Sequence, residues 1–271
     1  MRIPVKRNQD LASDLLSYER RIWEKGFTRI AGVDEAGVGP LAGPVVAAAV
    51  ILPVQLCLPG VRDSKVLSPL QRSRLEEVLL REAVASAIGT AEVEEIREKN
   101  IYHASLQAMR RALLQLRPAP DYVLVDARTV PNVPWPQEKI IRGDSASQSI
   151  AAASILAKEY RDRLMVAYDK QYPQYGFGRH KGYPTPAHQK ALREFGPSPI
   201  HRASFRSVEE FSGLCQPLFY PLQTEIRQAA SCVELRNLRQ RLEGMACEFS
   251  LPERRRLSAL LCAAERRLKK P

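Results

Sequence analysis

The sequence predicts an α/β fold in which a mixed β-sheet is flanked by helices. Apolar segments of strand length alternate with longer amphipathic segments up to about residue 170. Turns rich in glycine and proline separate the earliest strands, which can pair as hairpins, whereas the later strands need crossover connections. After residue 211 the composition favours helices alone, so we expect a helical C-terminal extension beside the sheet.

The first part of the chain contains two predicted helices and three predicted strands. Leucines together with Ile22 and Trp23 form an apolar stripe among charged residues, which is typical of a helix. The pair Ser68-Pro69 predicts a helix start, because serine caps helix N-termini and proline fits the first helical position. The expected elements are a helix over 10–26, strands over 28–34, 45–52 and 83–93, and a helix from Pro69 to about Arg81.

The middle of the chain alternates helices with short buried strands. Two apolar strands are expected to end close to Asp126 and Asp144, and residues 171–205 have the composition of ordered loops with short helices. The expected elements are helices over 101–116 and 145–168 and strands over 122–125 and 139–141. We therefore divide the chain into an N-terminal helical segment (1–27), a main α/β domain (28–212) and a C-terminal helical extension (213–271).

The charge balance and the cysteines narrow the class of protein. The 271 residues carry a net charge of +11, which favours a polyanionic partner, either nucleic acid or an anionic membrane surface, although it could also be only a soluble basic surface. The five cysteines are widely spaced and form no Cys-x-x-Cys pair, so neither a zinc site nor a disulfide framework is indicated. No apolar run is long enough to cross a membrane. We expect a monomeric cytoplasmic protein that binds nucleic acid and no membrane.

Acidic residues follow three of the apolar strands. Asp34 and Glu35 come after RIAGV, Asp126 after YVLV and Asp144 after KIIRG. In α/β sheets, ligand sites form beyond the carboxyl ends of the strands. Four buried carboxylates there would repel one another unless cations compensated them, and Mg²⁺ prefers such oxygen ligands. The pattern predicts a divalent metal site that could support phosphodiester cleavage with two ions.

This interpretation meets a geometric objection and has simpler alternatives. Successive side chains of a strand point to opposite faces, so Asp34 and Glu35 face one site only if the strand ends there, with Gly37 as the break. Taken singly, Asp144 could be a helix N-cap, Asp126 a turn residue, and the Asp-Glu pair a solvated strand end. Their common position after three strands favours the metal site.

The glycine-rich stretch GVGPLAG also invites a dinucleotide-binding interpretation. That interpretation fails because Pro40 follows the second glycine, no helix opens after the motif, and no acid-ended second strand lies at the usual spacing. We expect instead a turn whose glycines let backbone N–H groups approach a ligand closely.

Six stretches of the sequence, in order, carry a resemblance to a known family. They are GVDEAGVGPLAGPVVAAAV, DSKVLSP, VLVDA, GDSASQSIAAASILAK, HKGYPTPAH and HRASF. Together they resemble bacterial ribonuclease HII, the type 2 ribonuclease H family, over about residues 28–212. The resemblance implies a ribonuclease H-like fold with a five-stranded mixed sheet flanked by helices, and makes 28–212 the catalytic domain.

The resemblance also implies an activity. It implies cleavage of the RNA strand of RNA–DNA hybrids, and incision on the 5′ side of single ribonucleotides in duplex DNA, leaving a 3′-hydroxyl and a 5′-phosphate. Matched to the family motifs, the metal-binding and catalytic carboxylates are Asp34, Glu35, Asp126 and Asp144. Two divalent ions, Mg²⁺ or Mn²⁺, are implied, one activating water and one stabilising the leaving 3′ oxygen.

Substrate-binding residues are implied in the same way. Gly37, Val38 and Gly39 stand where the family has Gly-Arg-Gly, which contacts the ribose 2′-hydroxyl and nearby phosphates. Val38 keeps the backbone donors but not the side-chain cation. Lys65 resembles the family lysine that contacts phosphate, its alternative being an exposed loop lysine. Tyr183 resembles the tyrosine that stacks on the sugar beside the ribonucleotide, its alternative being a packed aromatic residue.

Two further questions stay open at this stage. Because Val38 replaces the family arginine, the chain could be a catalytically impaired protein that only binds RNA–DNA hybrids, although all four carboxylates are present. The extension carries 11 lysines and arginines against 6 acidic residues from residue 211 onward. It could be a helical cap with a solvated basic face, which we favour, or an additional duplex-binding surface. The matched motifs also contain His180, His188 and His201, which we expect to be structural or to lie near a phosphate, and not to bind metal.

Overall fold

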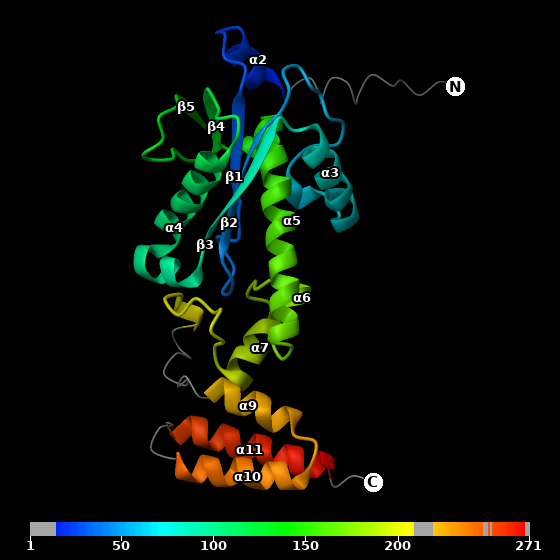
Figure 1. Cartoon of the computed structure of the whole chain (residues 1–271), viewed down its shortest axis with the longest axis vertical. Helices are drawn as coiled ribbons and strands as arrows, with labels where there is room; N and C mark the ends of the chain where they lie inside the picture. Colours follow the sequence, from blue (N-terminus) through cyan, green and yellow to red (C-terminus); the bar gives the residue numbers. More distant parts are fainter. Residues whose placement is uncertain (1–14, 209–218, 246–248, 250, 269–271) are drawn as a thin grey trace, which may run out of the picture.

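The computed structural model describes residues 15–208, 219–245, 249 and 251–268 (Figure 1). Its centre is a five-stranded sheet with the order β3-β2-β1-β4-β5. The strands are β1 (Ile30–Ala36), β2 (Val45–Ile51), β3 (Ala85–Ala91), β4 (Tyr122–Asp126) and β5 (Gln137–Ile140). The first three strands pair antiparallel, and β1, β4 and β5 pair parallel. The predicted mixed sheet is therefore confirmed.

Helices cover both faces of this sheet (Figure 1). The long helix α4 (Val93–Gln115) packs on one face, and α5 (Gln148–Gln171) with α3 (Pro69–Glu82) covers the other. The sheet and α5 approach closely at Gly32, where a β-carbon would lie 2.0 Å from the carbonyl carbon of Ser149. This contact places the first turn of α5 directly against β1, which carries two of the acidic residues.

Several helix boundaries differ from those expected from the sequence. The helix α4 runs from Val93 to Gln115, but Asn100 (φ 64°) is non-helical and kinks it. The helix expected over 101–116 is the part that follows this kink, and the helical stretch before the kink was not expected. The helix α5 begins at Gln148, because Ser147 caps it by accepting a hydrogen bond from the N–H of Ile150. The start of α3 is confirmed, with Ser68 as its cap.

Shorter elements connect the layers and carry site residues. They are the helices α2 (Ser17–Trp23), α6 (Phe177–His180) and α7 (Pro186–Phe195), and the 3₁₀ turns η1 (Ser64–Val66) and η2 (Gly143–Ser145). The expected loop-and-short-helix character of 171–205 is confirmed. Of the helix predicted over 10–26, residues 10–14 lie outside the described residues, and the described part is helical only over α2.

The C-terminal extension is helical, as expected, over its described residues. It contains α9 (Phe219–Gln228), α10 (Cys232–Gly244) and α11 (Leu251–Leu268), which lie beyond α7 at one end of the molecule (Figure 1). These helices bury a core of their own, to which Leu222, Leu238 and Leu261 contribute. One contact with α7 places the guanidinium of Arg227 4.3 Å from the ring centre of Phe195. Among the described helices, none is long and apolar enough to cross a membrane.

Candidate active site

Asp34 and Glu35 reach one site for a different reason from the strand end that was expected. The strand β1 does not end at Asp34 but continues to Ala36, and it is paired with β2 from Ala31 to Ala36. On its other edge, the pairing with β4 stops at Val33. Asp34 shares the α5 face of the sheet with Gly32, and Glu35 points to the α4 face. Because no β4 residue flanks the end of β1, carboxylates from both faces reach the same opening.

The other two carboxylates lie beside this opening. Asp126 is the last residue of β4, and its Oδ1 accepts a hydrogen bond of 2.7 Å from the N–H of Gly143. That bond draws η2, and with it Asp144, toward the end of β4. Asp144 is only 5% exposed and does not cap α5, so its interpretation as a helix N-cap was wrong. Asp34 is 4% exposed, which excludes a solvated strand end.

A cavity of about 300 Å³ joins the predicted site residues. Its lining includes Asp34, Glu35, Gly37, Val38, Gly39, Lys65, Asp126 and Tyr183. Asp144 stands outside this lining, but its Oδ2 lies 3.1 Å from Nζ of Lys65. All nine candidate residues are therefore in the cavity wall or one contact from it.

Three of the carboxylates have raised pKa values, chiefly because they are buried. Burial raises the pKa of Asp34 well above its ordinary value, and the charges of Glu35 and Asp126 raise it further. Burial also raises the pKa of Glu35, although the guanidinium of Arg128 opposes this. Burial likewise raises the pKa of Asp126. Each shift means that the negative form is disfavoured until a cation comes close.

The donor set suits a hard divalent cation. Its members are carboxylate oxygens, and Oε2 of Glu35 is buried without a hydrogen-bond partner. Side-chain cations compensate part of the charge, since Arg128 lies 3.4 Å from Glu35 and Lys65 contacts Asp144. As they stand, no three His, Cys, Asp or Glu side chains of the described residues are close enough to enclose an ion. An ion bound to these oxygens would share Glu35 with Arg128 and Asp144 with Lys65.

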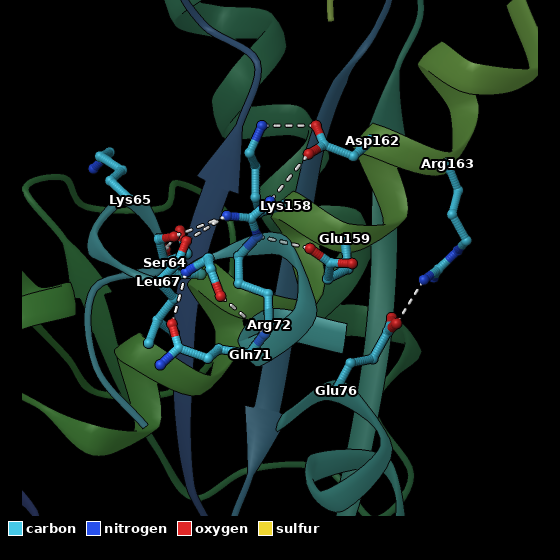
Figure 2. Close-up of polar contacts among 12 residues, drawn as sticks. Ser64, Lys65, Leu67, Gln71, Arg72, Glu76, Lys158, Glu159, Asp162 and Arg163 are labelled. Carbon is cyan, nitrogen blue, oxygen red and sulfur yellow. Dashed lines mark hydrogen bonds and ion pairs between the residues drawn. The ribbon is translucent and has the colours of Figure 1, made fainter. Parts of the chain in front are cut away.

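A buried arginine fixes the loop that carries Lys65 (Figure 2). Arg72 of α3 donates to the carbonyl oxygens of Ser64 and Leu67 at 3.4 and 2.8 Å. Its Nε also donates to Glu159 of α5 at 2.7 Å. The backbone of η1 is thus tied to α5, while the Lys65 side chain remains 76% exposed and can reorient.

Histidines hold the segment on which Tyr183 lies. Nδ1 of His188 lies 2.9 Å from the carbonyl oxygen of Tyr183, and its Nε2 lies 2.9 Å from Nε2 of His201. The N–H of Ser198 donates to Nδ1 of His201, so His201 carries its proton on Nε2 and donates it to His188. These contacts give both histidines a structural role, which is one of the two roles expected for them.

Sequence reasoning missed several residues of this region. Arg128, Arg161, Arg202 and Ser154 lie in the matched motifs or next to them, yet most of their partners are backbone groups or distant side chains. Such partners produce no local spacing pattern. A signal did exist for Arg128, because a cation two residues after a strand-end aspartate is placed to balance it.

Fold and site together define a class: an α/β nuclease with a carboxylate site at the end of a five-stranded mixed sheet. The ribonuclease HII family model matches residues 31–208. Ribonuclease HII of Myxococcus xanthus (strain DK1622) is 59% identical over 201 residues, covering 74% of this chain and 69% of the relative. Ribonuclease HII of Geobacillus kaustophilus (strain HTA426) is 54% identical over 197 residues, covering 73% and 75%.

A solved structure agrees with these sequence matches. The crystal structure of ribonuclease H2 from Pyrococcus horikoshii OT3 aligns with a TM-score of 0.58 and 26% identity, covering 68% of this chain and 96% of that one. The chain belongs to the ribonuclease HII family and is a metal-dependent ribonuclease. These relatives give no support to the alternative of an impaired hybrid-binding protein.

Proposed function

We propose that the protein hydrolyses the RNA strand of RNA–DNA hybrids and incises duplex DNA on the 5′ side of single embedded ribonucleotides. The observation that carries this proposal is the shared cavity, where buried acidic residues meet a glycine turn and an exposed aromatic ring. The acidic residues suit phosphodiester chemistry, and the turn and ring suit recognition of one ribose. The products would carry a 3′-hydroxyl and a 5′-phosphate.

The carboxylates would hold the metal. We assign Asp34, Glu35, Asp126 and Asp144 as ligands, since they are the acidic groups whose charges meet at the ends of β1 and β4. Two divalent ions, Mg²⁺ or Mn²⁺, would activate a water molecule and stabilise the leaving 3′ oxygen. The protein's own part is to fix these oxygens: Gly143 orients Asp126, and the N–H of Glu35 donates to Oδ1 of Asp34 at 2.7 Å.

The cavity residues other than the carboxylates would select the substrate. The N–H groups of the Gly37-Val38-Gly39 turn are suited to donate to the 2′-hydroxyl and phosphate oxygens. The Tyr183 ring, 44% exposed, offers an apolar surface on which a sugar can rest. Lys65 would leave Asp144 to contact a phosphate. Because all these groups come from one chain, we further propose that the protein acts as a monomer, and that it works in the cytoplasm.

The test uses three duplexes incubated with the protein and Mg²⁺. One contains a single ribonucleotide in DNA, one pairs an all-RNA strand with DNA, and one is all DNA. We expect cutting on the 5′ side of the lone ribonucleotide, cutting of the RNA strand and no cutting of the DNA control. The Asp34→Asn variant is the matched control and should cut none of them.

Two results would contradict the proposal in different ways. Cutting of the long hybrid alone would show that the turn around Val38 does not recognise a single ribonucleotide. Tight binding without cutting, with either Mg²⁺ or Mn²⁺, would show that the carboxylates do not form a catalytically active metal site.

A further inference from the structure

Two buried arginines lie beneath the glycine-rich turn over residues 37–44, which we call the 37–44 turn. Arg161 comes from α5 and Arg202 follows α7, and each is 1% exposed. Neither forms an ion pair with any carboxylate of the described residues, which is rare for buried guanidinium groups. Burial lowers the pKa of Arg161 to about 10 and that of Arg202 to about 9. Both remain charged at neutral pH.

Backbone carbonyl groups take the place of the missing carboxylates. Arg202 donates to the carbonyl oxygens of Gly37, Val38, Pro40, Gly43 and Pro44 at 2.5–3.3 Å. Arg161 donates to those of Ala42, Pro44 and Lys181 at 3.0–3.1 Å. The two guanidinium groups thus hold most carbonyls of the 37–44 turn on its buried side.

This arrangement determines where the amide N–H groups of the turn point. In a planar trans peptide, the C=O of one residue is opposite to the N–H of the next. When Arg202 draws the carbonyls of Gly37 and Val38 inward, the N–H groups of Val38 and Gly39 must face away from it. The residues 37–39 line the site cavity, and among the described residues the N–H groups of Val38 and Gly39 have no backbone acceptor. They are available to a ligand.

The buried arginines also explain why residue 37 is a glycine. Gly37 has φ +96°, and a β-carbon there would lie 2.1 Å from Nε of Arg161. A β-carbon on Gly39 would instead meet Tyr183 at an ordinary 3.8 Å. Gly37 is therefore required by the arginine beneath it, while Gly39 borders the open cavity.

We propose that Arg161 and Arg202 are positioning residues for ribonucleotide recognition. Their hydrogen bonds orient the N–H groups of Val38 and Gly39 toward the substrate. Their positive charges, on the buried side of the turn, replace the side-chain charge that Val38 lacks. This inference rests on the proposed function and adds residues to it. Because no carboxylate neutralises them, their field extends to an anionic phosphate in the cavity more strongly than that of a surface ion pair.

The first test separates the orientation of the N–H groups from the effect of the positive charge. Arg202→Lys keeps the positive charge but loses the planar fork that gathers the carbonyls. Binding is measured in the Asp34→Asn background, to a duplex with one ribonucleotide and to an all-DNA duplex. We expect the preference for the ribonucleotide to fall by about tenfold or more, with all-DNA affinity changed by less than about threefold. Arg111→Lys, where the fork binds Glu95 and a carbonyl far from the cavity, is the matched control and should keep the preference.

The outcomes distinguish the inference from the proposed function. If the protein with Arg202 intact shows no preference for the ribonucleotide, the proposed function fails at that step. If the preference exists and Arg202→Lys retains it, or weakens both duplexes equally, the function stands and the inference is overturned.

A second test leaves both arginines in place, so it does not depend on a variant that could unfold. Val38→Arg adds the cation that the family motif carries on the turn. Because the buried pair already supplies positive charge, we expect duplex affinity to rise by less than about threefold. A larger gain would show that the buried charges do not serve this purpose and would overturn the inference.

Discussion

The ammonium group of Lys65 lies 3.1 Å from Oδ2 of Asp144 and makes an ion pair with it. The lysine side chain is 76% exposed and the aspartate side chain only 7%. Burial alone would lower the pKa of Lys65, but the hydrogen bond to Asp144 raises it. An exposed cation is therefore paired with a carboxylate that we assign to the metal, and we expect Lys65 and a divalent ion to compete for Asp144.

Removing this competitor should have two opposite effects. In Lys65→Met, we expect the Mg²⁺ concentration for half-maximal activity to fall by roughly fivefold, since an exposed ion pair contributes at most about 1 kcal/mol. The KM for substrate should rise, because the phosphate contact is lost. Steady-state kinetics at several Mg²⁺ concentrations measures both quantities.

The matched control is Lys158→Met. Lys158 also lines the cavity and also pairs with a carboxylate, but with Asp162 on its own helix at 2.7 Å (Figure 2). Its removal should leave the Mg²⁺ requirement unchanged. If Lys65→Met raised the Mg²⁺ requirement instead, Lys65 would be assisting the ion and not competing with it.

The second prediction concerns Asp34, whose charge is unfavourable without metal. Asp34→Asn keeps the shape and can still accept the hydrogen bond from the N–H of Glu35. Burial and the charges of Glu35 and Asp126 raise the pKa of Asp34, so its ionised form destabilises the metal-free fold above that pKa. We expect the variant to be inactive yet more stable than the unmodified protein at neutral pH without metal.

Thermal unfolding with and without Mg²⁺ checks this. The difference in stability should shrink as pH falls, because Asp34 then becomes protonated in the unmodified protein as well. Added Mg²⁺ should raise the melting temperature of the unmodified protein and have little effect on Asp34→Asn. A variant less stable than its parent without metal would contradict the electrostatic account.

Local patterns in the sequence predict the sheet and the acidic residues well. Period-two and apolar runs locate β1, β2 and β4 within about two residues, and Ser68 marks the start of α3 correctly. The end of β1 was misplaced, because Gly37 looks like a strand break while the pairing with β2 continues to Ala36. The convergence of Asp34 and Glu35 depends on the shorter pairing with β4, and that register is a long-range property.

The arginines show what local reasoning does not reach. Arg202 is bonded to carbonyl groups more than 150 residues away in sequence, and a carbonyl group is present at every position. The residue types of the 37–44 turn therefore do not indicate that its carbonyl groups bind Arg202. Residue identity predicts charge pairs and caps, whereas partners chosen by backbone geometry become visible only in the folded chain.

The third prediction concerns His188, which is buried and neutral. Burial lowers its pKa to about 4, and His180 and His201 stack or pack beside it. In the unfolded chain His188 takes up a proton near pH 6.5, whereas in the folded chain it stays neutral until about pH 4. The free energy of unfolding therefore falls as pH decreases from about 6.5 toward 4. Between pH 7 and 5 this amounts to roughly 2 kcal/mol.

The variant His188→Asn isolates this contribution. It keeps a donor near the carbonyl oxygen of Tyr183 but cannot titrate in this range. Denaturant unfolding at several pH values should show a smaller loss of stability between pH 7 and 5 than in the unmodified protein, whatever the variant's stability at pH 7. Parallel curves would mean that His188 is protonated in the folded protein.

The last prediction concerns the C-terminal extension, in which three arginines have partners within the extension. Arg239 pairs with Glu265 at 2.7 Å and Arg241 with Glu225 at 2.6 Å. Arg267 donates to two carbonyl oxygens at 2.7 Å. Since these charges already have partners, we expect the extension to act as a helical cap and not as a duplex-binding surface.

Deleting residues 213–271 should therefore leave the salt dependence of duplex binding nearly unchanged. Each phosphate contact contributes about 0.9 to the slope of log K against log salt, so the slopes should agree within about one. Stability should fall modestly, by about 0.5–2 kcal/mol, from the lost contact of Arg227 with Phe195. Replacing the exposed Arg254 and Arg255 by glutamine in the full chain repeats the test without deletion. A slope that flattens by two or more on deletion, or by more than about one in the double glutamine variant, would show that the extension binds the duplex.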